Sequence, residues 1–363
     1  MNNIAGIWNR INRCLFPHLN ECLPGMTETH LRLATVLEVI RIEDHVPPAW
    51  MQWCGRKRSD RKAVARAFVA KVVHKMPTTK ALIERLRADK NLRALCGWEY
   101  AGQVPDESTF SRAFAEFART GLLDQVHEAL VKHHLGDERV WHVSRDSTAI
   151  EAREKAVRKE AKESKPNGKR GRPKKGEERP VVEAKRLTRQ RKQSAQEAIA
   201  ELPTACDIGT KKDAKGHKTR WIGYKFHMDV IDGDIPVCGL TTSASMHDSQ
   251  AAIPMGKITA ERVTSWYDLM DSAYDAKEIR ESSLELGHVP IIDANPRRGK
   301  PVSMEPDRAR RYRNRSSAER VNSRLKDDCG GRNVRVRGAP KVHTHLMFGV
   351  LVLFAEALLG LTP

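Results

Sequence analysis

The stretch YRNRSSAERVNSRLK, residues 312–326, places five polar side chains on one face of a predicted helix. They are spaced three, four, three and four residues apart: Tyr312, Arg315, Glu319, Asn322 and Lys326. At about 100° per residue, all five fall within an arc of roughly 80°. A second face, about 100° further round, carries Ala318, Val321 and Leu325, which would hold the helix against a core. One carboxylate flanked by Tyr, Arg and Lys is suited to holding a cation beside a polyanion.

The composition favours nucleic acid as the partner of this chain. Of 363 residues, 64 are Lys or Arg and 46 are Asp or Glu, so the formal net charge is +18. Such an excess attracts polyanions, and an anionic membrane surface is the alternative to nucleic acid. The length is sufficient for two or three domains with substantial cores.

A strongly apolar segment lies at residues 346–361, LMFGVLVLFAEALLGL. The segment is just short of a membrane-spanning helix and contains Glu356, so we expect a C-terminal core helix and no membrane partner, with a membrane segment as the alternative. Residues 1–13 lack the apolar run of an export signal, and the seven cysteines include no C-x-x-C pair. Both observations favour a cytoplasmic protein.

Residues 1–138 are expected to form a helical N-terminal domain. Thr27 is a candidate helix cap ahead of apolar residues at helical spacing, and Phe110, Phe114 and Phe117 share one side of a later helix. Several short helices in a basic chain suit a DNA-binding domain. The alternative is a helical bundle that only packs on the rest of the protein.

Residues 139–363 are expected to form an α/β domain, because hairpin strands are followed by alternating helix and strand. Asp232-Gly233-Asp234 is a hairpin turn signal between two of the strands. The predicted strands span residues 140–147, 221–230, 235–242, 267–271 and 288–293, and a helix is predicted at 275–285.

A basic segment at about residues 151–193 interrupts this α/β domain. It has almost no large apolar side chains before Val181, which predicts a mobile insertion. Within it, KRGRPK at residues 169–174 resembles the core of an AT-hook, in which arginines enter the narrow minor groove of DNA. We therefore predict DNA contact for Arg170 and Arg172. The alternative is that a basic loop produced this short motif by chance.

Three carboxylates are placed where they could meet. Asp146 and Asp271 each end a predicted strand, and Glu319 lies on the polar helix face. Carboxylates that converge at the rim of a sheet can bind divalent cations, which activate one oxygen of a phosphodiester reaction and stabilise the other. A strand-end Asp is also a common turn or helix cap. Asp248 and Asp293 are further carboxylates that could lie near such a site.

These residues resemble the motifs of DDE transposases from bacterial insertion sequences of the IS-four and IS-five supergroup. Tyr312, Arg315, Glu319 and Lys326 match the pattern Y-x-x-R-x-x-x-E-x-x-x-x-x-x-K. Asp146-Ser147-Thr148 is similar to the first acidic motif of that family. The segment 271–275, DSAYD, resembles the second, except that Ala replaces the usual Gly at its third position.

The resemblance implies a ribonuclease-H-like catalytic domain in which Asp146, Asp271 and Glu319 bind two Mg²⁺ ions, with Mn²⁺ as a substitute. Such enzymes cut double-stranded DNA at the terminal inverted repeats of their element and join the 3′-hydroxyl ends to target DNA. By analogy, Tyr312, Arg315 and Lys326 would grip phosphates near the cut end. A homodimer on DNA and a place at the bacterial nucleoid follow from this mechanism.

Asn322 and Trp221 lie outside the family signature. Asn322 shares the polar helix face, and for that reason we predict that it contacts DNA. Some relatives hold a flipped base with a tryptophan of the insertion, and Trp221 is a candidate. The neighbouring apolar residues favour a packed strand for Trp221 instead.

Two other functions remain possible on the sequence. A metal-dependent DNA nuclease would use the same metals and fold without strand transfer. A DNA-binding repressor with a dead site would keep only the binding surfaces. All three acidic residues are present, which argues against the repressor.

Overall fold

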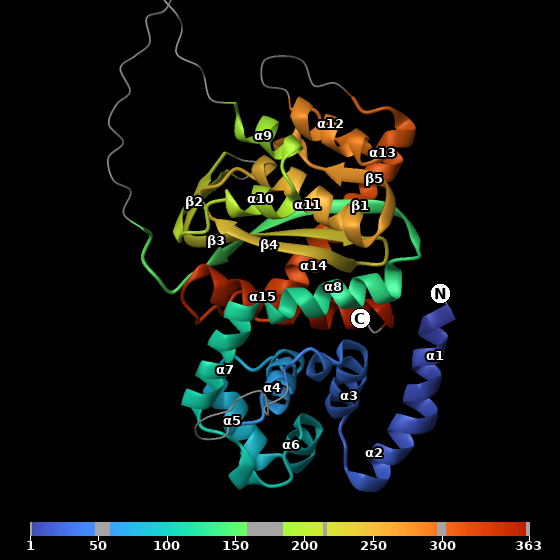
Figure 1. Ribbon diagram of the computed structural model, residues 1–363, viewed down its shortest axis with the longest axis vertical. Coiled ribbons are helices and arrows are strands. Elements are labelled where there is room, and N and C mark those ends of the chain that lie inside the picture. The colour runs from blue at the N-terminus through green and yellow to red at the C-terminus, as the bar shows by residue number, and fades with distance from the viewer. Residues whose placement is uncertain (1, 48–58, 158–183, 213–215, 296–302, 361–363) are drawn as a thin grey trace, which may run out of the picture.

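The computed structural model describes residues 2–47, 59–157, 184–212, 216–295 and 303–360. A helical N-terminal region lies against a mixed α/β region, so the predicted α/β chain with a helical leader is confirmed (Figure 1). The leader contains α1 (Asn2–Arg10), α2 (Phe16–Cys22), α3 (Glu28–Ile40), α4 (Arg61–Val73), α5 (Thr79–Ala88), α6 (Lys90–Cys96), α7 (Glu107–Thr120) and α8 (Leu122–Leu135).

The helices of the leader are held by aromatic side chains at helical spacing. Phe68 of α4 packs edge-on against Phe110 and Phe114 of α7, with ring centroids 5.7 and 5.1 Å apart. Phe348, from the far end of the chain, lies 5.4 Å from Phe68. The leader and the C-terminal helix therefore share one hydrophobic core.

The α/β region is built on one mixed sheet. Its strands are β1 (Arg139–Glu151), β2 (Asp207–Lys212), β3 (Lys218–Ile231), β4 (Ile235–Ser243), β5 (Thr264–Met270) and β6 (Val289–Ile292). The order is β2-β3-β1-β5-β6, and β4 also pairs with β3. β1 is central, antiparallel to β3 and parallel to β5. All five predicted strands are present, whereas the Lys-rich β2 was not predicted.

Two local features of the sheet follow from its sequence. Gly233 and Asp234 both have positive φ, which is the turn geometry that a tight hairpin between β3 and β4 requires. Trp221 is 9% exposed and pairs with Gly209 of β2. A Cβ at Gly209 would lie 2.3 Å from the Trp221 ring, so the glycine makes room for a buried tryptophan.

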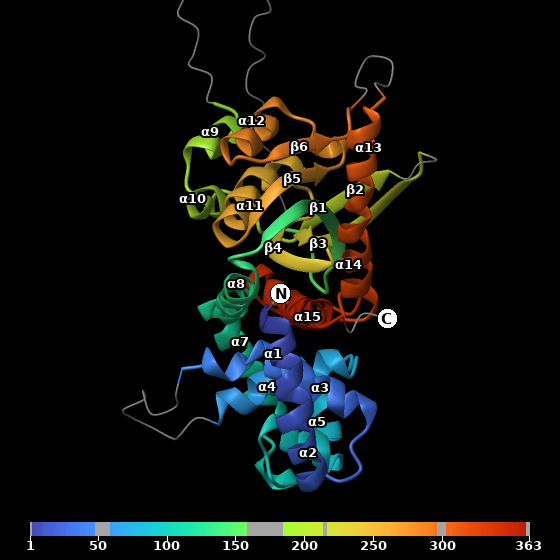
Figure 2. The same cartoon turned by 90° about the vertical axis from the view of Figure 1, so that its right-hand side faces the viewer.

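Helices cover the sheet on both sides. They are α9 (Arg186–Lys192), α10 (Ala195–Ala200), α11 (Ser249–Arg262), α12 (Lys277–Glu285), α13 (Pro306–Tyr312), α14 (Ser316–Asp327) and α15 (Ala339–Leu358). α13 and α14 follow one another beside the sheet (Figure 2). The predicted single helix over residues 312–326 is wrong in one respect, because a 3₁₀ turn, Arg313–Arg315, separates α13 from α14.

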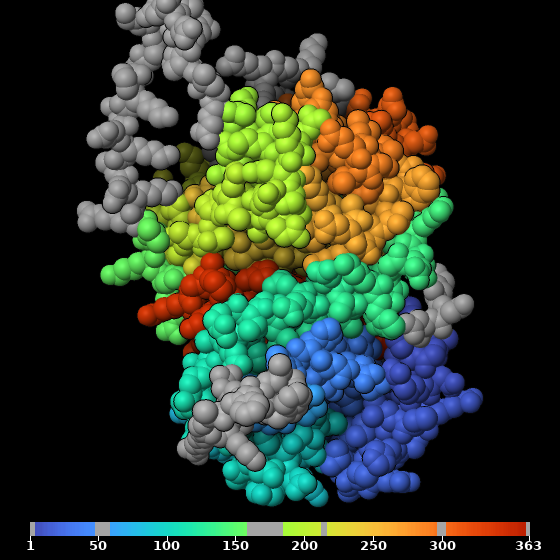
Figure 3. Space-filling model, viewed as in Figure 1, coloured from blue at the N-terminus to red at the C-terminus, as the bar shows by residue number. Residues whose placement is uncertain are grey.

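The predicted C-terminal core helix lies within α15, which begins seven residues earlier than expected and contacts β4, α3, α4, α7, α8 and α14. Among the described residues, α15 alone is long and apolar enough to cross a membrane, and 78% of that window is buried inside the protein. In the space-filling view, α15 is visible only as a strip between the leader and the α/β region (Figure 3). The burial supports a core helix.

One end of the predicted insertion belongs to the folded domain. β1 continues to Glu151, and residues 186–192 form α9, which contacts α11 and α12. Gln190 of α9 is fully buried and donates from Nε2 to the Gln250 carbonyl at 2.9 Å. Lys257 of α11 donates to the Gln190 carbonyl at 2.8 Å. Residues 184–193 are therefore not a mobile segment, because buried polar contacts fix them. Arg170 and Arg172 lie outside the described residues.

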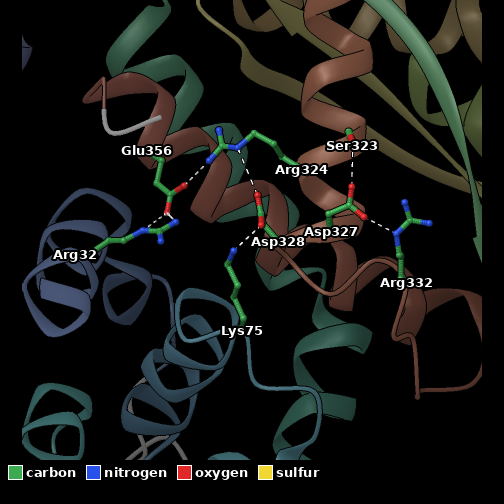
Figure 4. Close-up of polar contacts among 8 residues, drawn as sticks. All are labelled: Arg32, Lys75, Ser323, Arg324, Asp327, Asp328, Arg332 and Glu356. Atoms are coloured by element: carbon green, nitrogen blue, oxygen red, sulfur yellow. Dashed lines mark hydrogen bonds and ion pairs between the residues drawn. The ribbon is translucent and has the colours of Figure 1, made fainter. Parts of the chain in front are cut away.

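A buried carboxylate joins the leader to α14. Glu356 of α15 is 1% exposed and accepts from Arg32 Nε of α3 at 2.8 Å and from Arg324 Nη2 of α14 at 2.7 Å. Arg324 also lies 4.0 Å from Asp328, which pairs with Lys75 beyond α4 at 2.6 Å (Figure 4). This chain of charges ties the helix that carries Glu319 to two separate parts of the leader.

Replacing Glu356 with Gln is expected to lower the free energy of unfolding by about 1–3 kcal/mol, because two guanidinium groups lose their anionic partner. The loss is moderate since both arginines can reach water. Urea denaturation followed by circular dichroism measures it. The matched control is Asp44→Asn, which breaks a pair with Arg41 whose side chains are both about half exposed and should change little. Equal midpoints for the two variants would contradict the prediction.

Candidate active site

The prediction that Asp146 ends a strand is wrong, because β1 continues to Glu151 and pairs with β3 beyond Asp146. Asp146 lies near the middle of β1, with its side chain 20% exposed. Asn322 Nδ2 of α14 donates to Asp146 Oδ2 at 3.0 Å, and Arg315 Nη1 lies 3.9 Å from Oδ1. Burial raises the pKa of Asp146 to about 6; Asp271 adds to this rise, and Arg315 opposes it. Asp146 is therefore a partly desolvated carboxyl group, and the negative charge of Asp271 repels its ionised form.

Asp271 follows the last residue of β5. Its Oδ1 accepts from the backbone N–H of Ala273 at 2.9 Å and caps a 3₁₀ turn. Because β5 pairs parallel to β1, the end of β5 brings Asp271 close enough to Asp146 for the two charges to interact. Burial raises the pKa of Asp271, and Arg315 again opposes the rise. The Ala that replaces the family's Gly leaves this turn intact.

Glu319 is the carboxylate that stays apart. Its side chain is 53% exposed and is bonded to Arg315 four residues earlier. Within the described parts of the chain, no three His, Cys, Asp or Glu side chains are grouped so that they could hold a metal ion. The fold thus brings Asp146 and Asp271 together and places Arg315 between Asp146 and Glu319.

The remaining residues of the polar helix face lie around this pair. The Arg315 guanidinium is 5.7 Å from the Tyr312 ring centroid. Lys326 is half-buried, and burial lowers the pKa of its ammonium group. The charges of Arg332 and Lys211 lower this pKa further, whereas the charge of Asp146 opposes the decrease. DNA contact by Tyr312, Arg315, Asn322 and Lys326 stays a prediction. Asn322 has a contact that the sequence did not suggest, because it faces a carboxylate.

The two competing carboxylates have different places. Asp248 accepts from Lys225 Nζ at 2.8 Å and lies close enough to Asp271 to raise the pKa of Asp271. Burial opposes ionisation of Asp248, but His227 and Lys225 keep the pKa of Asp248 below its usual value. Asp293 is exposed beyond β6. The charge of Asp248 therefore acts on Asp271, although Asp248 is itself paired with Lys225.

Two family models match separate parts of this chain. A family model described as a transposase DDE domain matches residues 141–355, which include Asp146, Asp271 and Glu319. The chain belongs to this family. A second model, described as a transposase domain, matches residues 19–116 of the leader. No curated protein and no solved structure shows significant similarity to the chain.

The protein is thus a DDE transposase of an insertion sequence, and DNA is its partner. The narrower IS-four and IS-five grouping stays a prediction. Lys211 of β2 is a site neighbour that sequence reasoning missed: its charge opposes the rise that burial causes in the pKa of Asp271. The only sequence signal was the pair Lys211-Lys212, which looks like an ordinary solvated surface.

Transposases of this family generally use divalent metal ions. Asp146 and Asp271 supply carboxylate oxygens, which hard cations prefer. Asn322 Oδ1 is buried and has no hydrogen-bond partner among the described residues, although its Nδ2 is bonded to Asp146. A cation could accept coordination from the unpaired Asn322 oxygen, and its charge would offset the repulsion between Asp146 and Asp271.

Proposed function

We propose that this transposase cleaves double-stranded DNA at the terminal inverted repeats of its element and joins the 3′-hydroxyl ends to target DNA. The observation that carries the proposal is the partly buried pair Asp146 and Asp271, with Arg315 beside it, in a chain of the transposase DDE domain family. Magnesium is the expected ion, with manganese as a substitute.

In this proposal Asp146 and Asp271 hold the metal ions and Glu319 completes the set. When bound, two such ions activate a water or a 3′-hydroxyl and stabilise the leaving oxygen. Asn322 keeps Asp146 oriented through its amide hydrogen bond. Arg315 and Lys326 offset the charge of the scissile backbone, and Tyr312 donates to a phosphate oxygen.

Arg315 gives the site a switch between free and DNA-bound forms. In the free protein its guanidinium is bonded to Glu319 and lies 3.9 Å from Asp146. A DNA phosphate would compete for that guanidinium, because arginine binds phosphate in a bidentate manner as well as it binds carboxylate. Glu319 would then be free to turn toward the aspartates. DNA binding and assembly of the acidic site are coupled in this way.

The strand order supports a ribonuclease-H-like catalytic domain. β4, β3 and β1 are consecutive antiparallel neighbours, and β5 and β6 continue the sheet parallel to β1. Asp146 lies on β1, and Asp271 directly follows the neighbouring strand β5. We further propose a homodimer on DNA, because two element ends must be held together, and a cytoplasmic location at the nucleoid.

The catalytic assignment is tested by Glu319→Gln. In the presence of Mg²⁺, the variant should cleave a duplex carrying the flanking inverted repeats at least about 100-fold more slowly than wild type. The matched control is Glu201→Gln, which changes an exposed carboxylate that pairs with Arg189 and, among the described residues, makes no hydrogen bond or ion pair with Asp146, Asp271 or Glu319. A Glu319→Gln variant that cuts as fast as wild type would remove Glu319 from the mechanism.

The same assay separates transposase from nuclease. A labelled 3′-hydroxyl end should appear covalently joined to an added target plasmid. Cleavage without any joined product would favour the nuclease, and binding without cleavage would favour the repressor.

A further inference from the structure

A basic cavity of about 600 Å³ lies between the leader and the C-terminal part of the chain, away from the acidic pair. Its floor is apolar and is formed by Phe68, Phe114 and Phe348, all of which are buried. α4 and α7 contribute one wall, and the segment leading into α15 contributes the other. The cavity therefore joins the two segments that match separate transposase families.

Its polar lining is strongly cationic. The cations are Lys71, Lys80, Arg335, Arg337 and Lys341, and they face one carboxylate, Glu107. Among the described residues, Lys71, Lys80, Arg335 and Lys341 have no hydrogen bond or ion pair through their side chains. Lys71 is half-buried, whereas the side chains of Lys80, Arg335 and Lys341 are exposed at the rim of the cavity. By contrast, the largely buried Lys225 on β3 is paired with Asp248. A concave surface with five cations and one carboxylate has a positive potential that favours binding of an anion.

Lys71 is the cavity cation whose charged form is most clearly disfavoured by its surroundings. It is half-buried on α4, and burial lowers the pKa of Lys71 to about 8, with Arg335 adding to the effect. A lysine is desolvated beside an arginine at a cost, which an anion between the two would offset. The first turns of α5, α7 and α15 contribute Thr79, Glu107 and Lys341 to the lining of this cavity.

We propose that this cavity is a second phosphate-binding site, which takes a backbone phosphate of the DNA strand outside the acidic site. The phosphate lies among Lys71, Arg335 and Lys341, and the phenylalanine floor accommodates the attached sugar. The inference rests on the proposed function, because that function makes DNA the molecule that supplies the phosphate. Because the leader and the C-terminal segment both line the cavity, DNA bound there contacts both parts of the chain.

The test compares DNA binding by wild type and by the triple variant Lys71→Met, Arg335→Gln and Lys341→Gln. Fluorescence anisotropy of a labelled inverted-repeat duplex is measured in EDTA from 50 to 300 mM salt, so that the metal site does not contribute. Each lost phosphate contact reduces the salt slope by about 0.9, and the affinity of the triple variant should fall roughly tenfold or more.

The control triple variant is Arg41→Gln, Lys132→Gln and Lys277→Gln, which removes the same charge from exposed side chains on the surface. The salt slope of DNA binding by this control variant should differ from the wild-type slope by less than about 0.9, the change expected for one phosphate contact. If the cavity variant does not fold, Lys341→Gln alone serves, because that side chain is exposed at the start of α15. It should lower the slope by about one contact.

Three results would overturn the inference. The cavity and control variants could lose the same affinity, or Lys341→Gln could leave the slope unchanged. Deoxyadenosine monophosphate could also protect wild type but not the cavity variant from thermal unfolding while DNA binding stays equal, which would assign the cavity to a free nucleotide. If wild type binds no duplex at all, the proposed function fails. If wild type binds and the cavity variant binds equally well, only the second site fails.

Discussion

Replacing Asp146 with Asn is expected to abolish DNA cleavage and, at pH 7.5, to make the protein more resistant to unfolding. Cleavage should fall roughly 10³-fold or more, the scale seen when one member of a catalytic unit is removed. The variant keeps the shape of the side chain, and its amide oxygen can take the place of Oδ2, which accepts from Asn322 in the wild type. Loss of a negative charge, rather than loss of packing, is the change being measured.

The gain in stability follows from the pKa of Asp146, which burial raises from 3.8 to about 6. A carboxyl whose pKa is higher in the folded chain favours folding below its unfolded pKa. That contribution is lost as the pH rises through about 6. At pH 7.5 the wild-type protein therefore holds an unfavourable charge, and the neutral amide should raise the free energy of unfolding by about 1–3 kcal/mol.

Thermal unfolding in EDTA and the cleavage assay in Mg²⁺ together check this expectation. At pH 4 the gain in stability should largely disappear, because Asp146 is then protonated in the folded wild type. The control is Asp327→Asn, an exposed carboxylate at the end of α14 that pairs with Arg332. It should alter neither property much. A destabilised Asp146→Asn protein, or one that still cleaves, would contradict the role given to this residue.

Replacing Asp229 with Asn is expected to give the largest loss of stability, about 3–5 kcal/mol, because it leaves a guanidinium buried without its counter-ion. Asp229 is fully buried on β3, directly opposite Arg145 of β1. Arg145 donates to both of its oxygens at 2.7 Å, and Thr259 of α11 donates at 2.6 Å. The pair fixes the register of the strand that carries Asp146.

The matched control is the double variant Arg145→Met with Asp229→Leu. It removes both charges and fills the same space with apolar atoms, so it should be closer to wild type than the single variant is. Guanidinium denaturation compares the three proteins. If Asp229→Asn unfolds at the wild-type midpoint, or if the double variant is the less stable of the two, the buried pair does not have the role that its geometry indicates.

Local features of the fold could be predicted from the sequence because short-range sterics decide them. Asp232-Gly233-Asp234 specifies its hairpin by backbone conformation, and the spacing of Phe110, Phe114 and Phe117 specifies one face of α7. β2 could not be predicted, because Asp207–Lys212 is a polar segment without the apolar alternation of a strand. It forms a strand because it pairs with β3, and this pairing exists only in the folded chain. α9 was assigned to a mobile segment because its composition is charged, whereas buried contacts hold it.

For the candidate site, the sequence named Asp146, Asp271 and Glu319, but it gave them equal standing. In the folded chain the two aspartates are partly desolvated and interact, while Glu319 is half exposed and bonded to Arg315. Burial and charge pairing depend on which surfaces the fold covers. No spacing along the helix contains that information.

The sequence by itself determined the residue types of the polar helix face, their common direction and the basic character of the chain, because helical periodicity and charge are local properties. Only the tertiary structure decided which of these side chains meet. Parallel pairing of β1 with β5 places Asp271 beside Asp146, and packing of α14 against the sheet turns Asn322 toward a carboxylate. The cavity around Lys71 exists because segments far apart in the chain close over one core, and desolvation there is a property of the assembled fold.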